Sequence, residues 1–165
     1  MPMADPLIRR ARLPEAPALT AIAHAAKRRW GYPEAWMNAW SAALTIAPTT
    51  IEEHTVLVAE LAGTVRGVAV LADRRSHWSL EHLWVDPATQ RQGVGRALFE
   101  SVVREAGGRR PGVLRVESDP QAVGFYERMG ARRSGTMPAP VLGTPRELPM
   151  LELDIGDTLV TSDGQ

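Results

Sequence analysis

The segment 80–98 constrains the fold more than any other part of the chain. A strand-like stretch leads into a short turn and then into a loop with two glycines, Gly93 and Gly95, that opens an amphipathic helix. Glycine tolerates a left-handed backbone and the close approach of a ligand. The first N–H groups of a helix have no intrahelical partner and carry partial positive charge, so this corner is suited to a pyrophosphate. The alternative is an ordinary helix start whose glycines only form a turn.

Two common phosphate-binding motifs do not fit this loop. The P-loop requires a Gly-Lys-Ser/Thr sequence, and the only lysine of the chain is Lys27. The dinucleotide-binding fingerprint requires a third glycine at position 98, which is a leucine. The remaining pattern is Gln-x-x-Gly-x-Gly over residues 90–95, after a strand that ends in Val-Asp-Pro. This pattern resembles the acetyl-CoA-binding motif of the GNAT (GCN5-related) N-acetyltransferases.

A second motif downstream strengthens the resemblance. After a predicted strand at 112–117, Asp119 is a favoured N-cap, Pro120 fits a first helical position and Gly130 suits the left-handed residue after the last turn. In the GNAT family this helix carries the pattern A-x-x-F-Y-x-x-x-G, matched here by Ala122, Phe125, Tyr126 and Gly130. The family often has asparagine in the first turn, where this chain has Asp119 and Gln121.

The order of elements predicts one α/β domain over residues 1–156, followed by a short polar tail at 157–165. Strands are expected at 7–11, 55–61, 65–72, 77–85, 112–117, 132–136 and 148–155. Helices are expected at 15–30, 34–44, 92–106 and 120–129, with a capping box at 49–52 and a helix stop at Gly107 and Gly108. The resemblance implies a GNAT-type mixed, mostly antiparallel sheet of six to seven strands, with helices on both faces and a splay at the cofactor site.

Composition excludes several classes of chemistry. The chain has no cysteine, which removes disulfides, thiolate metal sites and a cysteine acyl-enzyme. Its four histidines lack paired spacing, so no metal site is expected. A formal net charge of zero gives no reason to expect nucleic acid as a partner. No apolar run reaches the ~18 residues of a membrane span, and the first residues lack a signal-sequence pattern, so a cytoplasmic location is expected. A homodimer through edge strands is possible.

The resemblance also implies roles for individual residues. Tyr126 would protonate the departing thiolate, since a phenol of pKa ~10 can hydrogen-bond to and protonate a thiolate whose thiol has a pKa of ~8.5. Glu81 is the first candidate for the base that takes the proton of the amine, with His82, on the opposite face of the strand, or a water chain as alternatives. The cofactor residues implied are Leu83, Trp84, Val85, Gln90, Arg91, Gln92, Gly93, Val94, Gly95, Arg96, Asp119 and Tyr126.

The acceptor site would lie against the N-terminal helices and the loop 137–149, with Trp30 and Tyr32 as its predicted substrate-binding residues. Three of the five tryptophans lie in 30–40, where they suit a cationic amine or an apolar amino acid, or simply pack in the core. The basic residues 27–29 fit an acidic substrate or the solvated end of a helix. The sequence selects no acceptor molecule. It leaves an N-acetyltransferase as the favoured function, with a non-catalytic acetyl-CoA sensor as the alternative and a nucleotide-binding protein disfavoured.

Overall fold

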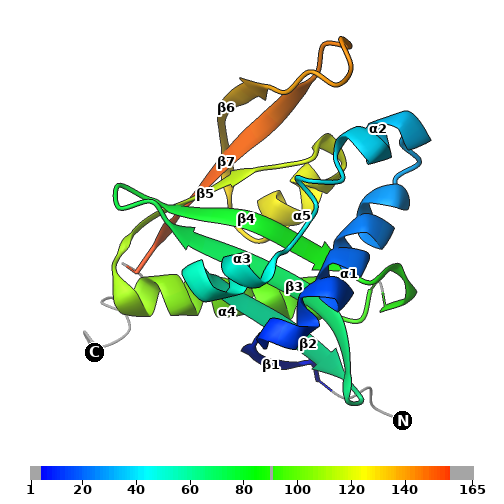
Figure 1. Cartoon of the computed structure of the whole chain (residues 1–165). Helices are drawn as coiled ribbons and strands as arrows, with labels where there is room; N and C mark the ends of the chain where they lie inside the picture. Colours follow the sequence, from blue (N-terminus) through cyan, green and yellow to red (C-terminus); the bar gives the residue numbers. More distant parts are fainter. Residues whose placement is uncertain (1–4, 90, 157–165) are drawn as a thin grey trace.

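The computed structural model describes residues 5–89 and 91–156, which form one seven-stranded sheet in the order β1-β2-β3-β4-β5-β7-β6 (Figure 1). The strands are β1 Leu7–Arg10, β2 Thr55–Leu61, β3 Thr64–Asp73, β4 Trp78–Val85, β5 Gly112–Glu117, β6 Arg132–Pro138 and β7 Glu147–Ile155. All neighbouring strands are antiparallel except β4 and β5, which run parallel. The predicted sheet is confirmed, and each predicted strand agrees with the structure to within two residues at either end.

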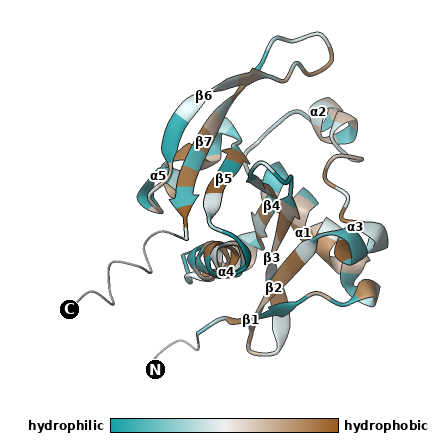
Figure 2. Ribbon diagram, turned by 90° about the vertical axis from the view of Figure 1, so that its left-hand side faces the viewer, coloured by the Kyte–Doolittle hydropathy of each residue, from teal (hydrophilic) through white to brown (hydrophobic). Residues whose placement is uncertain are grey.

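Helices cover both faces of the sheet (Figure 2). One face carries α1 Ala16–Arg28, α2 Glu34–Ala39 and α3 Pro48–Glu53, and the other carries α4 Val94–Arg109 and α5 Val123–Arg128. The larger core lies under α4 and α5, where Leu98, Phe99 and Val102 pack against the sheet. On the opposite face Leu19 and Ile22 of α1 pack on alternate residues of β2 and β3. The two-residue period of the strands therefore supplies apolar side chains to both layers.

The sheet opens between β4 and β5. Their register pairs join Trp78–Leu80 to Leu114–Val116 and end there, while β4 continues to Val85 along β3. A register shift opposite Val70 and Leu71 leaves Glu81 without a partner in β3, which is the pattern of a β-bulge. Before the bulge Trp78 and Leu80 face the α4 side. After it Leu83 and Val85 face that side, and Trp84 faces α1.

Two helix boundaries differ from the prediction. Gly107 and Gly108 do not end α4, which continues to Arg109, because neither glycine has a positive φ and the Arg110 N–H still bonds to the Ala106 carbonyl. The predicted capping box at 49–52 does not form. The helix begins two residues earlier, at Pro48, with Ala47 as its N-cap and no side-chain cap, because proline suits a first helical position.

The other three predicted helices are shorter than expected, and the first of them, expected at 15–30, covers Ala16–Arg28. The helix expected at 34–44 ends at Ala39 and continues as turns. In the second motif Asp119 is an N-cap whose carboxylate accepts the Gln121 N–H, but its first turn is a 3-10 helix, Pro120–Ala122, and α5 begins at Val123. Gly130 has the predicted left-handed backbone, with φ +100°.

Candidate active site

A cleft of about 600 Å³ lies between β4, the turn before α4, α5 and the end of α1. It is lined by ten of the residues predicted from the sequence: Trp30, Leu83, Trp84, Val85, Arg91, Gly93, Val94, Gly95, Arg96 and Tyr126. Seven further residues line it: Arg29, Ala122 and Phe125, which belong to segments or motifs recognised in the sequence, and Ala26, Thr89, Gln121 and Arg128, which had no predicted ligand contact. Gln92 and Asp119 do not line the cleft, and Gln90 lies outside the described residues.

The glycine turn presents the start of α4 to this cleft. Gly93 is the residue before the helix and has φ +79°, a left-handed conformation that a residue with a Cβ rarely adopts. A Cβ at Gly93 would have no atom within 4 Å, so glycine is required here for its backbone angle and not for space. Among the described residues no side chain caps the helix. Its first N–H groups are therefore available to an anion, which the helix dipole favours.

The charge of the cleft has one sign. Four of its lining residues are arginines, Arg29, Arg91, Arg96 and Arg128, and none of the described lining residues is a carboxylate. Arg96 makes an exposed ion pair with Glu100 on the next turn of α4, which contributes little. A cleft with this charge favours a polyanionic ligand over a neutral one.

Tyr126 contributes a hydroxyl to the same cleft. Its ring is buried against Phe99 and Phe125, with centroids 5.9 and 5.2 Å away. Among the described residues the hydroxyl has no hydrogen-bond partner, and none of their buried polar side-chain atoms is left unpaired, so it opens onto the cleft. Burial and the nearby Asp119 carboxylate raise the pKa of Tyr126, so the phenol stays protonated at neutral pH.

The two candidate bases on β4 have different surroundings. Glu81 is exposed at the bulge, forms an ion pair with Arg74 and does not line the cleft. His82 is partly buried, and its Nδ1 accepts a hydrogen bond of 2.9 Å from the Trp84 indole. Burial lowers the pKa of His82, so the ring is neutral at pH 7. An indole N–H only donates, so the proton of His82 is on Nε2.

Asp119 lies at the centre of a buried polar group, which we call the Asp119 cluster: Lys27, Tyr32, Asp119 and Arg146. Its carboxylate accepts hydrogen bonds from Lys27 Nζ at 2.7 Å, the Tyr32 hydroxyl at 2.9 Å and Arg146 Nη2 at 3.0 Å. Burial alone would raise the pKa of Asp119, but the hydrogen bonds from Lys27, the Gln121 N–H and Tyr32 lower it. Two residues predicted to contact ligands, Asp119 and Tyr32, are thus bonded to each other.

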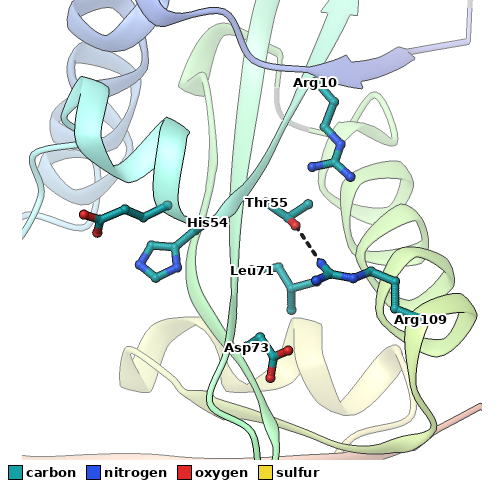
Figure 3. Close-up of a pocket in the computed structure, with 7 residues that line it drawn as sticks. Arg10, His54, Thr55, Leu71, Asp73 and Arg109 are labelled. Atoms are coloured by element: carbon teal, nitrogen blue, oxygen red, sulfur yellow. Dashed lines mark hydrogen bonds between the residues drawn. The ribbon is translucent and has the colours of Figure 1, made fainter.

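A second hollow of about 330 Å³ lies at the far end of α4 (Figure 3). The length of α4, about 24 Å, separates it from the glycine turn. Three of its four charged side chains have protein partners: Asp73 pairs with Arg110, Arg10 with Glu105, and Arg109 donates to the Thr55 hydroxyl, while Glu53 has no ion pair among the described residues. The paired charges indicate a structural role for this hollow.

Within residues 5–89 and 91–156, no group of three or more histidines and carboxylates is placed to hold a metal ion. The helices described there include none long and apolar enough to cross a membrane.

Comparison with known proteins agrees with this geometry. Residues 25–137 match the sequence model of the acetyltransferase (GNAT) domain. The chain therefore belongs to the GNAT acetyltransferase family. The Gln-x-x-Gly-x-Gly segment, the splayed strands and Tyr126 all lie within the matched residues.

Comparison with individual proteins gives low sequence identity or covers only part of the chain. The chain is 36% identical over 74 residues to the peptidyl-lysine N-acetyltransferase YjaB of Salmonella typhimurium, a match that spans 45% of this chain and about half, 48%, of that protein. A GCN5-related N-acetyltransferase from Rhodopseudomonas palustris has a similar fold, with a TM-score of 0.78 and 22% identity over 94% of this chain and 99% of that one. The PaiA N-acetyltransferase of Thermoplasma acidophilum, solved with coenzyme A, gives a TM-score of 0.76 and 15% identity over 92% and 99%.

Proposed function

We propose that the protein transfers an acetyl group from acetyl-CoA to a primary amine of a small molecule or peptide, directly within a ternary complex. One observation carries the proposal: the open helix start behind Gly93, the arginines and the Tyr126 hydroxyl all belong to a single cleft. The helix start and the arginines suit the phosphates of a coenzyme, and the Tyr126 hydroxyl suits its sulfur. Membership of the GNAT family and the coenzyme A bound by PaiA support the same donor.

In this proposal each part of the cleft has its own task. The N–H groups at the start of α4 bind the pyrophosphate, and Arg91 and Arg96 add positive charge beside it. The segment Leu83–Val85 lines the cleft beyond the last register pair with β5, and we assign it to the pantetheine arm. The arm would lead the thioester toward Tyr126.

The transfer forms a C–N bond and breaks a C–S bond. A protonated amine loses one proton to the base, and so to solvent, before attack, and a second proton as the amide forms. Sulfur gains one proton from Tyr126, which the second amine proton replaces. An amine such as lysine has a pKa near ~10.4, so a base must take its proton at neutral pH. We assign this role to Glu81 acting through water, because the acceptor nitrogen of His82 is already bonded to Trp84. Tyr126 gives its proton to the departing thiolate. With no cysteine in the chain, no cysteine acyl-enzyme forms, which fits direct transfer.

Alignment of the two substrates is the largest contribution we assign to the enzyme. Holding both reactants in one cleft can remove about 7–11 kcal/mol of the barrier. General acid–base catalysis of 10²–10⁴-fold corresponds to about 3–5 kcal/mol.

A product assay tests the proposed function. The protein is incubated with acetyl-CoA and a panel of polyamines, amino acids, amino sugars and lysine peptides, and acetylated products are sought by mass spectrometry alongside release of the coenzyme thiol. Thiol release that depends on an amine and yields its N-acetyl derivative supports the proposal. Binding of acetyl-CoA with no acetylated product from any amine supports the alternative, a non-catalytic acetyl-CoA sensor.

The YjaB relative is named for peptidyl-lysine, which is why lysine peptides belong in the panel. The cytoplasmic location and the homodimer stay predictions, and the proposed reaction requires neither.

A further inference from the structure

The Asp119 cluster lies directly beside the cofactor cleft. Asp119 accepts the backbone N–H of Gln121, and the Gln121 side-chain amide donates to the Trp30 carbonyl at 3.4 Å. Gln121 and Trp30 both line the cleft, so they form the boundary between cleft and cluster. The cluster brings together α1, the segment after α1, the start of the second motif and the segment before β7. In Figure 1 the loop between β6 and β7 and helix α2 lie at the same end of the molecule.

The cluster has more positive than negative charge. It contains two basic side chains, Lys27 and Arg146, and one carboxylate, Asp119. Burial and the charge of Arg146 lower the pKa of Lys27, and its hydrogen bond to Asp119 opposes that shift. The side chains of Lys27 and Arg146 are only 10% and 11% exposed. The nearest carboxylates in the sequence do not compensate, because Glu34 and Glu147 are exposed and Glu34 pairs with Arg28. Buried charges are normally paired, so one excess cation at the edge of a substrate cleft points to an anionic ligand.

The aromatic rings around the cluster are already occupied by cations of the chain itself. Lys27 Nζ lies 4.2 Å from the Trp40 ring centroid, and the Arg146 guanidinium lies 5.0 Å from Trp40 and 5.3 Å from Tyr32. These contacts argue against the cation–π site for a cationic acceptor that the sequence left open. A second cation there would meet two positive charges.

Arg146 has hydrogen-bond donors to spare. Its Nη2 bonds to Asp119 and to the Tyr32 hydroxyl, and the described residues offer no partner to Nε or Nη1. Because no buried polar side-chain atom among those residues is unpaired, these two groups are open to solvent. An arginine held by a carboxylate on one side and open on the other is oriented to bind a further anion.

Given the proposed function, we propose that the amine acceptor carries a carboxylate that binds Arg146 and neutralises the Asp119 cluster, so that the substrate class is a free amino acid. The single negative charge of a carboxylate matches the one excess positive charge of the cluster. A phosphate ester carries a charge of about −1.5 to −2 at pH 7, which exceeds it. Arg146 and Lys27 then select the acceptor without touching the reacting atoms.

Matched pairs of substrates test this assignment. Each common L-amino acid and its C-terminal amide are compared as acceptors at saturating acetyl-CoA, and kcat and KM are measured for the pairs that react. We expect the preferred acid to exceed its amide in kcat/KM by about tenfold or more, the size of a hydrogen bond to a charged group. Arg146→Gln should remove this preference by raising KM for the acid at nearly constant kcat, and Arg146→Lys should restore part of it. The thermal shift with coenzyme A controls for folding of each variant.

Three results overturn the assignment. Amides that react as well as acids in the wild type would show that no carboxylate is recognised. An equal loss for acid and amide in Arg146→Gln, with coenzyme A still bound, would make the cluster purely structural. Acetylation of amines that lack a carboxylate, with no reaction of any amino acid, would leave the proposed function intact and refute only the substrate class. Absence of transfer to every amine would refute the proposed function itself.

Discussion

At the residue scale, the chemistry depends on side chains whose surroundings fix their protonation. Tyr126 remains a neutral phenol at pH 7, because burial and the Asp119 carboxylate raise its pKa, and it lines the cleft where a hydroxyl can hydrogen-bond to the leaving thiolate. The sequence predicted this tyrosine from its motif. It could not predict the effect of Asp119, because that depends on where the complete fold places its carboxylate relative to α5.

Replacing Tyr126 with phenylalanine should slow the enzyme without abolishing it. We expect kcat to fall by about 10²–10⁴-fold, the contribution of a general acid, because alignment of the substrates is retained. Binding of acetyl-CoA should be unchanged, as a calorimetric titration would show. A variant with wild-type kcat would remove Tyr126 from the mechanism.

Glu81 and His82 can be separated by two substitutions. Glu81→Gln should lower kcat by about 10²-fold or more through loss of the base. His82→Asn should have a small effect, since the Asn side-chain oxygen can replace Nδ1 as the acceptor for Trp84 but cannot take up a proton. Steady-state rates over a range of pH would show which change matters. A large loss in His82→Asn with normal activity in Glu81→Gln would reverse the assignment.

At the scale of single elements, the glycines at the two ends of α4 have different backbone conformations. Gly93 before the helix is left-handed, and Gly108 near its end is helical, although both would have open space around a Cβ. The sequence predicted the first because a motif surrounds it, and misjudged the second because two adjacent glycines resemble a helix stop. The bulge at Glu81 had no sequence signal at all.

This difference predicts opposite effects of alanine. Gly108→Ala should raise the free energy of unfolding by up to about 0.5–1 kcal/mol, because it lowers the entropy of the unfolded chain without strain. Gly93→Ala should lower the free energy of unfolding, because the Cβ of alanine is strained in a left-handed backbone. Urea unfolding of the two variants tests the pair. Destabilisation by Gly108→Ala would indicate that the helix does end at residue 106.

At the scale of the whole molecule, the Asp119 cluster connects segments that are far apart in the sequence. The predicted sheet and both motifs depend on local patterns, and the sequence specified them well. Lys27 and Arg146 meet at Asp119 only through the complete fold. The sequence could place both in segments lining the acceptor site, but it could not show that they share one carboxylate.

Asp119→Asn should therefore destabilise the protein strongly at neutral pH, by about 3–5 kcal/mol, because it leaves two buried cations without their carboxylate. The control Glu34→Gln, in an exposed ion pair, should cost at most about 1 kcal/mol. The folded state lowers the pKa of Asp119 from 3.8, so its stabilisation is present above that pH and is lost as the pH falls below it. The gap between wild type and Asp119→Asn in urea unfolding should then narrow in acid. A small difference in the free energy of unfolding between wild type and Asp119→Asn at pH 7 would contradict a stabilising role for the Asp119 ion pairs.

The most direct test of the central claim is a thermal-shift titration of the wild type and Gly93→Glu with acetyl-CoA, coenzyme A and ATP. At about 100-fold over Kd, a ligand of the folded state should stabilise the wild type by about 2.7 kcal/mol. We predict this shift for acetyl-CoA and coenzyme A but not for ATP, and its loss in Gly93→Glu. No shift with either coenzyme, or an equal shift in both proteins, would contradict the assignment of the cleft to acetyl-CoA.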